Sequence, residues 1–275
     1  MDPNVAGSNP VDRPIFLGSP LHFVQALLLG IIQGITEFFP ISSSAHLKFA
    51  RYLLGLPDGP HWVYFDLACH AGTWLALCWF LRKDILQVLT SWRQIGLFAC
   101  ALAPLVPAYF LMKPLRLALS PPQYTGYFLL ATAALLAVSL KKPTTTSPLK
   151  YKNMLSIGVM QSLALLPGLS RSGSTIAAGR FCGLSWTAAA RCSFLLAVPT
   201  ILGGEMIESY KLLKGTSDAT GAISLDCYAA GFLASLLIGL FSVRLVFKIY
   251  ERQQIKPFIW YCAAFGLLLI AVFHG

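Results

Sequence analysis

Long apolar stretches, separated by short basic or proline-rich segments, make up most of this 275-residue chain. A helix needs about 20 predominantly apolar residues to cross the hydrocarbon core of a bilayer. Six stretches reach or approach this length: 62–81, 94–112, 123–140, 185–203, 227–247 and 258–273. The pattern therefore predicts six transmembrane helices in an all-α, polytopic membrane protein.

Two further apolar regions, 21–54 and 154–182, are each interrupted by a short break, at 39–42 and 167–170. Helices usually end before a proline, and serine caps the helix that follows. Each half is too short to cross a bilayer, so we predict two re-entrant helical hairpins. Irregular backbone at membrane depth is tolerated only where protein or a water-filled cavity covers it.

The two broken regions are copies of one pattern. Shifting the first by 128 positions places Gln33 on Gln161 and Ser42 on Ser170 without a gap. Three predicted spans follow each copy, which indicates a tandem repeat. The expected organisation is a loose N-terminal leader at 1–20, repeat 1 at 21–140, a cytoplasmic linker at 141–153 and repeat 2 at 154–275.

Basic residues at the span ends indicate how the spans are oriented. They form three clusters: Arg82, Lys83 and Arg93; Lys141, Lys142, Lys150 and Lys152; and Lys248, Arg252 and Lys256. The positive-inside rule places these clusters in the cytoplasm, with Lys113 and Arg116 as exceptions. Three spans per repeat is an odd number, so we predict an inverted-topology repeat with hairpins that meet near the midplane.

Composition agrees with a membrane location. Hydrophobic residues make up 56% of the chain and charged residues 12%, against about 25% charged in soluble domains. The net charge of +10 does not indicate a nucleic-acid partner, because the basic residues lie between apolar stretches and face anionic lipid headgroups. The seven cysteines show no CxxC or Cys/His cluster, which favours small buried side chains over disulfides or zinc.

Gln33 and Glu37 precede the first break, four positions apart and therefore on one helical face. A carboxylate at membrane depth is costly and is a candidate functional group. One interpretation is a hard-cation site formed by the Glu37 carboxylate and the Gln33 carbonyl. The other is a polar contact that holds one hairpin to the other, for instance through Arg171.

Three serines and a histidine follow the first break. Ser42 either caps the next helix or faces a substrate. Ser43 and His46 are three positions apart, so hydroxyl and imidazole can share a helical face. This arrangement suits a serine nucleophile with a histidine base, or a histidine that itself accepts a phosphoryl group.

Arg171 begins the helix after the second break, in a turn rich in glycine and serine. Backbone N–H groups at a helix start and a guanidinium fork both suit phosphate. A structural salt bridge to Glu37 is the alternative, and both could hold at once. The residues expected to bind substrate are Ser42, Ser44, Gly168, Ser170, Ser172, Gly173 and Thr175.

Three more ionisable residues fall within predicted spans. Asp66 and His70 share a helical face, and Arg191 lies in the matching span of the other repeat. We favour a structural helix-to-helix pair among them over a role in lining a cavity.

On these residues the chain resembles the undecaprenyl-pyrophosphate phosphatase family, which is also linked to bacitracin resistance. One family signature is a glutamate or glutamine followed four positions later by glutamate, here Gln33 and Glu37, with the serine-rich turn and His46 behind it. The other is Pro-Gly-x-Ser-Arg-Ser-x-x-Thr, here 167–175. The resemblance extends from about Leu21 to the C terminus. Many members carry glutamate at the position of Gln33, so this chain has one carboxylate fewer at the expected cation site.

The resemblance implies an enzyme of the bacterial cytoplasmic membrane that removes the terminal phosphate of a C55 polyprenyl diphosphate. The product is the monophosphate carrier lipid for cell-wall synthesis. It also implies Mg²⁺ or Ca²⁺ as cofactor and a site that opens to the outer face. The expected catalytic residues are Glu37, Ser43, His46 and Arg171, and the expected cation ligands are Glu37 and Gln33. The expected partners are the lipid substrate and membrane lipids. Whether the protein also forms a homodimer is left open by the sequence.

Two other functions fit parts of the pattern. Inverted repeats with polar hairpins at the midplane are also typical of transporters, so a polyprenyl-phosphate transporter or flippase is the main alternative. A non-catalytic bacitracin-sequestering or assembly protein is the third. Only the phosphatase requires a nucleophile beside a phosphate-binding turn.

Overall fold

The computed structural model of the chain describes residues 21–56, 62–145, 149–214 and 223–274, so the predicted leader at 1–20 lies outside the described residues. All regular secondary structure in these residues is α-helical. The helices are α1 Phe23–Thr36, α2 Ser43–Leu53, α3 Trp62–Phe80, α4 Arg82–Leu89, α5 Trp92–Leu102, α6 Leu105–Leu111, α7 Lys113–Ala118, α8 Pro122–Leu140, α9 Tyr151–Leu163, α10 Arg171–Phe181, α11 Trp186–Leu213, α12 Leu225–Glu251 and α13 Lys256–His274.

Several of these helices are long and apolar enough to cross a membrane, so the chain is an all-α, multi-pass membrane protein. Five segments of the described chain qualify: Trp92–Leu111, Pro122–Leu140, Trp186–Lys211, Leu225–Glu251 and Lys256–His274. The sixth predicted span, 62–81, is the 19-residue helix α3, which is not among the five. Its polar residues Asp66 and His70 lower the hydropathy of an otherwise apolar helix.

Two predicted spans differ from the helices that the structure contains. The span 94–112 is interrupted between α5 and α6 at Pro104, because proline has no N–H to donate and its ring clashes with the preceding turn. The span expected to end at Gly203 continues as α11 to Leu213. A glycine pair weakens a helix by about 1 kcal/mol per residue but does not end it.

The two broken regions form matching helix pairs. α2 begins at Ser43 and α10 at Arg171, and each has 11 residues, so their bounds differ by the same 128 positions as the sequence pattern. Each helix follows a serine, Ser42 in one region and Ser170 in the other. α9 begins at Tyr151, within the stretch 141–153 that was expected to be a linker.

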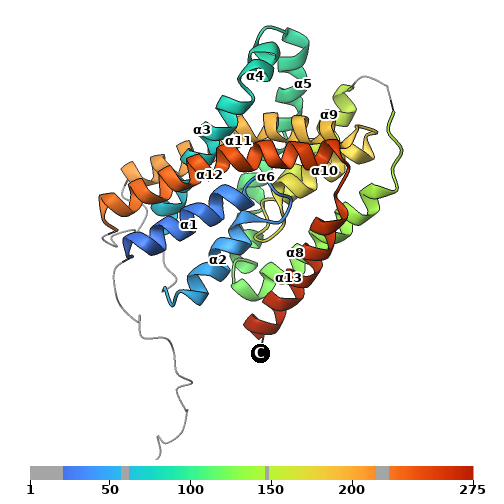
Figure 1. Ribbon diagram of the computed structural model, residues 1–275. Helices are drawn as coiled ribbons and strands as arrows, with labels where there is room; N and C mark the ends of the chain where they lie inside the picture. Colours follow the sequence, from blue (N-terminus) through green and yellow to red (C-terminus); the bar gives the residue numbers. More distant parts are fainter. Residues whose placement is uncertain (1–20, 57–61, 146–148, 215–222, 275) are drawn as a thin grey trace, which may run out of the picture.

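Small residues allow α12 to approach α1 and α3 closely. A Cβ added at Gly30 would lie 2.5 Å from the carbonyl oxygen of Gly231, and one added at Gly34 would lie 2.9 Å from Cβ of Ile238. Helices in membranes associate through such small-residue contacts. Figure 1 shows α12 alongside α1, and α8 beside α13 at the opposite side of the molecule.

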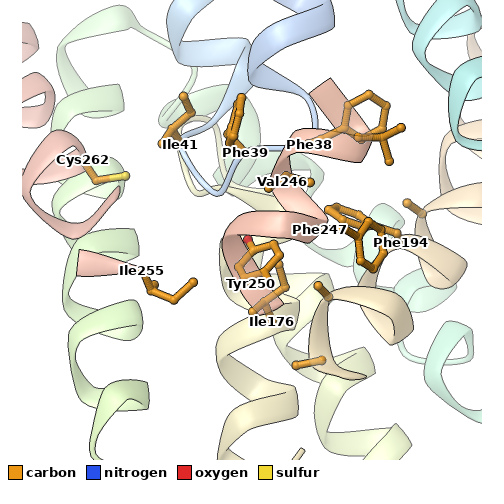
Figure 2. Packing of buried hydrophobic residues seen from close by; sticks show 14 of the residues in the cluster. Phe38, Phe39, Ile41, Ile176, Phe194, Val246, Phe247, Tyr250, Ile255 and Cys262 are labelled. Atoms are coloured by element: carbon orange, nitrogen blue, oxygen red, sulfur yellow. The ribbon is translucent and has the colours of Figure 1, made fainter. Parts of the chain in front are cut away.

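The turn between α1 and α2 is anchored by apolar side chains. Phe38, Phe39 and Ile41 are buried in the largest hydrophobic cluster of the described residues. Figure 2 shows them extending toward Phe247 and Tyr250 of α12. Phe38 also makes an edge-to-face contact with Phe194 of α11, with ring centroids 6.0 Å apart. The polar groups of the turn are therefore carried on a rigidly packed backbone.

A cation–π contact between an arginine and a tryptophan occurs in each of the two copies. The guanidinium of Arg51 lies 4.8 Å from the ring centroid of Trp62, and that of Arg180 lies 5.0 Å from the ring centroid of Trp186. Each arginine is near the end of the short helix, and each tryptophan begins the helix that follows. Arg51 also pairs with Asp66. Buried cation–π contacts thus fasten each short helix to the next helix.

Candidate active site

The backbone of the first hairpin holds Ser42 in a rare conformation. Its φ of 68° and ψ of 92° lie where a side chain is strained, at a cost of about 1–3 kcal/mol. Nδ1 of His46 donates a hydrogen bond to the Ser42 carbonyl at 2.8 Å, which helps to hold this conformation. Ser42 occupies the N-cap position but makes no side-chain cap. Its hydroxyl lies 3.3 Å from that of Ser44 instead, so the capping interpretation is wrong.

The second hairpin has a true cap at the equivalent position. The Ser170 hydroxyl accepts a hydrogen bond from the backbone N–H of Gly173 at 3.1 Å and lies 3.2 Å from the Ser172 hydroxyl. Arg171 is the first residue of α10. The Ser172 hydroxyl donates to the carbonyl of Phe39 at 3.1 Å, which joins the second hairpin to the first.

One pocket of about 640 Å³ lies where the two hairpins meet. Its remaining walls are parts of α3 and α11. The predicted site residues that line it are Glu37, Ser42, Ser43, Ser44, Ser170, Arg171 and Ser172. Residues 134 positions apart are thus brought into one site.

Glu37 is the centre of the hydrogen bonds in this pocket. Arg171 Nη2 donates to its Oε1 at 2.5 Å, and the hydroxyl of Ser43 donates to its Oε2 at 2.8 Å. Gln33 Nε2 donates to the same Oε2 at 3.0 Å. The Glu37 side chain is 6% exposed and that of Arg171 19%. The predicted link between the hairpins is therefore present, and Arg171 still faces the pocket.

The expected partnership of Ser43 with His46 is not found. His46 donates from Nδ1 to the Ser42 carbonyl, and its Nε2 forms a hydrogen bond with the Tyr261 hydroxyl at 2.7 Å. The ring stacks on Phe265 of α13, with centroids 4.4 Å apart. His46 is not among the described residues that line the pocket. A spacing of three places two residues on one helical face, but it does not fix the direction of the side chains, and the His46 ring packs against α13.

Three residues expected to bind substrate lie behind the lining, among described residues that do not face the pocket. Gly168 has a φ of 94°, and a Cβ there would lie 2.6 Å from the carbonyl of Thr125. Gly173 uses its N–H in the Ser170 cap. The buried hydroxyl of Thr175 donates to the Arg171 carbonyl at 2.8 Å. These residues shape and support the turn, and the pocket-facing groups of the two turns include the serines and Arg171.

The wall opposite the hairpins carries Asp66, His70, Glu205 and Glu208. The expected pairing of Asp66 or His70 with Arg191 is wrong, because Arg191 pairs with Asp84. Nδ1 of His70 donates to the carbonyl of Asp66 at 2.8 Å, and its Nε2 lies 3.8 Å from Oε2 of Glu37.

Glu205 and Glu208 were not among the predicted site residues, because the span was expected to end at Gly203. A signal was present, since both lie on one face with the apolar residue Ile201, at spacings of three or four. Lys211 donates to Glu208 at 2.6 Å. Glu205 has no hydrogen bond or ion pair with any residue in the described part of the chain.

The hydrogen bonds of Gln33 and Glu37 show whether these two residues could hold a divalent cation. Both oxygens of Glu37 already accept hydrogen bonds, one of them from the cationic Arg171. The described residues contain no group of three His, Cys, Asp or Glu side chains that could hold a metal. Gln33 Oε1 is buried without a hydrogen-bond partner among the described residues, but it stands beside a carboxylate that already accepts three hydrogen bonds. Gln33 and Glu37 alone therefore do not fit the expected cation.

Comparisons with known proteins agree with the motifs. A family model described as "Bacitracin resistance protein BacA" matches residues 26–268. A protein of Protochlamydia amoebophila named undecaprenyl-diphosphatase is 36% identical over 252 residues, which is 91% of this chain and 98% of that protein. Proteins of the same name from Geobacter metallireducens and Pelobacter propionicus are 36% and 34% identical, over 91% and 92% of this chain and 98% and 97% of their own lengths.

Proposed function

The chain belongs to the bacitracin resistance protein BacA family, and on that premise we propose that it hydrolyses undecaprenyl diphosphate to undecaprenyl monophosphate and phosphate. The observation that carries this proposal is the convergence of Ser43, Glu37 and Arg171 in one pocket. The names of the relatives, which match over nearly their whole length, support it. The product is the lipid carrier that returns to cell-wall synthesis.

Arg171 and the serines of both turns are the proposed diphosphate-binding groups. The Arg171 side chain lines the pocket and is 19% exposed, so part of the guanidinium can reach a phosphate oxygen. Phosphate is well matched by the planar guanidinium fork. The hydroxyl of Ser44 lines the same pocket and can donate to a further oxygen, whereas the hydroxyl of Ser172 already donates to the carbonyl of Phe39.

Ser43 is the proposed nucleophile and Glu37 its base. As the bond from Ser43 Oγ to the terminal phosphorus forms, the serine proton passes to the Glu37 carboxylate, which it already contacts at 2.8 Å. The bond from that phosphorus to the bridging oxygen breaks, and the lipid monophosphate leaves as an anion. A water molecule then attacks the phosphorus of the phosphoserine, the bond from phosphorus to Ser43 Oγ breaks, Glu37 returns its proton to the serine oxygen, and phosphate is released. Arg171 stabilises the charge on the transferred group.

His46 has a positioning role in this proposal. It holds the carbonyl of the strained Ser42 and so fixes where Ser43 begins α2. Mass spectrometry of protein quenched during turnover tests the assignment. Phosphate on Ser43 is expected, and phosphate on His46 would contradict it.

We propose Mg²⁺ or Ca²⁺ as a cofactor that enters with the diphosphate, since magnesium is usually bound by one or two carboxylates together with substrate phosphates. Glu205 is the pocket carboxylate best able to face it, because its oxygens are not engaged by described residues. When bound, the cation would neutralise charge on the diphosphate. The steps assigned to Ser43, Glu37 and Arg171 are derived without it.

The proposed membrane arrangement has six spans, with α3 as the sixth, and two re-entrant hairpins in an inverted-topology repeat. Two observations support it: α2 and α10 have the same length with bounds that differ by 128 positions, and the basic residues follow the charge pattern described above. The pocket is proposed to open toward the outer face of the bacterial cytoplasmic membrane. A membrane-impermeant maleimide should label Ser44→Cys in intact cells, in a chain whose seven native cysteines have been replaced. The proposed homodimer is checked by mass measurement in detergent.

Release of phosphate by purified protein in detergent tests the function itself. The reaction needs no membrane, whereas transport requires two compartments. Hydrolysis of undecaprenyl diphosphate under these conditions is expected, and its absence from well-folded protein would favour the transporter alternative.

A further inference from the structure

Two neighbouring glycines in α11 differ from the packed glycines of the other long helices. A Cβ added at Gly72 would lie 2.2 Å from the Ser235 hydroxyl, and one at Gly126 would lie 2.5 Å from a carbonyl of α13. A Cβ added at Gly203 or Gly204 would meet nothing within 4 Å. Glycine costs a helix about 1 kcal/mol relative to alanine. Helix packing within the described chain therefore does not account for these two positions.

Gly204 lines the pocket, and Gly203 is not among the described residues that do so. Ile201 lies one turn before Gly204 on α11, and Val63 and Leu67 of α3 face the same pocket. We call these four residues the apolar strip; they share the pocket wall on α3 and α11 with Asp66, His70, Glu205 and Glu208. The phosphate-binding groups are on the hairpin side of the pocket. The pocket thus offers apolar contacts on α3 and α11 in addition to the polar groups of the hairpins.

We propose that the first isoprene units of the lipid chain lie along this strip, formed by Val63, Leu67, Ile201 and Gly204, and leave the pocket over Gly204. The inference rests on the proposed function, because a diphosphate held at Arg171 must be continued by an apolar chain. That chain has to pass from a polar site into the surrounding lipid. An opening above a helix position without a side chain gives it a path.

The chemistry of the strip fits this occupant. Each buried methylene group contributes about 0.8 kcal/mol to binding, and branched apolar side chains match the methyl-branched isoprene units. Another apolar wall, formed by Leu165, Leu166 and Leu169, belongs to the turn of the second hairpin, and its leucines are half-buried. Gly204 is exposed and faces open space. The strip on α3 and α11 is therefore the more accessible path.

Gly204→Leu places a side chain in this path without a clash with the protein. Gly203→Leu is the matched control, because it adds the same side chain to open space one position away and outside the lining. Both changes should favour the helix, so loss of folding is not expected. A third variant, Leu166→Trp, tests the other apolar wall.

Kinetics are measured for undecaprenyl, farnesyl and dimethylallyl diphosphate, which differ in chain length. For Gly204→Leu we expect at least a tenfold lower kcat/KM with the two longer substrates and less than a twofold change with dimethylallyl diphosphate. Gly203→Leu should match the wild type with all three. An equal loss with all three substrates, equal behaviour of the two leucine variants, or a chain-length effect only in Leu166→Trp would overturn the inference.

Binding separates this inference from the proposed function. The dissociation constant of non-hydrolysable farnesyl methylenediphosphonate should rise at least tenfold in Gly204→Leu and stay unchanged in Gly203→Leu. If the variants bind the analogue as expected but the wild type releases no phosphate, the proposed hydrolysis is contradicted and the chain path is supported. Hydrolysis by the wild type, with equal analogue binding in all variants, would support the function and overturn the path.

Discussion

Arg171 Nη2 and Glu37 Oε1 lie 2.5 Å apart although 134 positions separate them in the sequence. Both side chains are largely buried. A carboxylate at this depth is stabilised by such a partner, and the arginine is held toward the pocket. Neither hairpin contains the complete pair, so the site exists only when both halves of the chain are assembled.

Arg171→Lys should lower phosphate release by about 100-fold, even though the positive charge is retained. Lysine is a point charge and cannot contact Glu37 and a phosphate oxygen through separate nitrogens of one planar group. The measurement is kcat/KM for undecaprenyl diphosphate in detergent. Activity within threefold of the wild type would show that Arg171 supplies only charge.

Ser43→Ala should lower kcat by about 10³-fold or more, because it removes the proposed nucleophile. Ser44→Ala is the control, since Ser44 lines the same pocket but is bonded only to the hydroxyl of Ser42. We expect it to retain activity within about tenfold. Comparable losses in the two variants would contradict the assignment of Ser43.

His46→Ala should lower both activity and stability. Its ring packs against Tyr261 and Phe265 and holds the Ser42 carbonyl, so the midpoint of thermal unfolding should fall by several degrees. His46→Gln retains a donor and should recover part of kcat with KM unchanged. A complete loss of activity in both variants, at wild-type stability, would indicate that the imidazole itself takes part in the chemistry.

Asp66→Asn should destabilise the protein by about 3 kcal/mol, because it leaves the buried guanidinium of Arg51 without its counter-charge. The control is Asp84→Asn, whose partner Arg191 has a side chain that is 48% exposed. Such pairs contribute about 0–1 kcal/mol. Unfolding in SDS measures both, and equal effects would contradict the importance of the buried pair.

The sequence predicted the parts of this molecule that depend on local pattern. The offset of 128 between the two polar breaks reappears in the starts of α2 and α10 at Ser43 and Arg171. The contact between Glu37 and Arg171 was also among the predicted alternatives. These features follow from apolar periodicity, proline breaks and the cost of buried charge.

Features that depend on tertiary contacts could not be predicted in the same way. His46 shares a helical face with Ser43, but its ring forms a hydrogen bond with Tyr261 of the last helix instead. Ser43 bonds instead to Glu37 across a non-helical turn, where spacing rules do not apply. Glu205 was not predicted to line the pocket, because the preceding glycines suggested that the helix ends before it.

Removal of divalent cations by a chelator should abolish phosphate release, and Mg²⁺ or Ca²⁺ should restore it. Glu205→Gln should raise the cation concentration for half-maximal activity at least fivefold, because its carboxylate lines the pocket and makes no hydrogen bond or ion pair with the described residues. Glu208→Gln is the control, since Lys211 already engages Glu208. Activity that is unaffected by chelation would contradict a cation requirement.

Phosphate release from undecaprenyl diphosphate by purified protein in detergent tests the central claim most directly. Wild type, Glu37→Gln and Arg171→Ala are compared side by side at equal amounts of folded protein. The account predicts release by the wild type and a loss of about 10³-fold or more in each variant. No release by folded wild type, or full activity in either variant, would contradict a phosphatase site built on this pair.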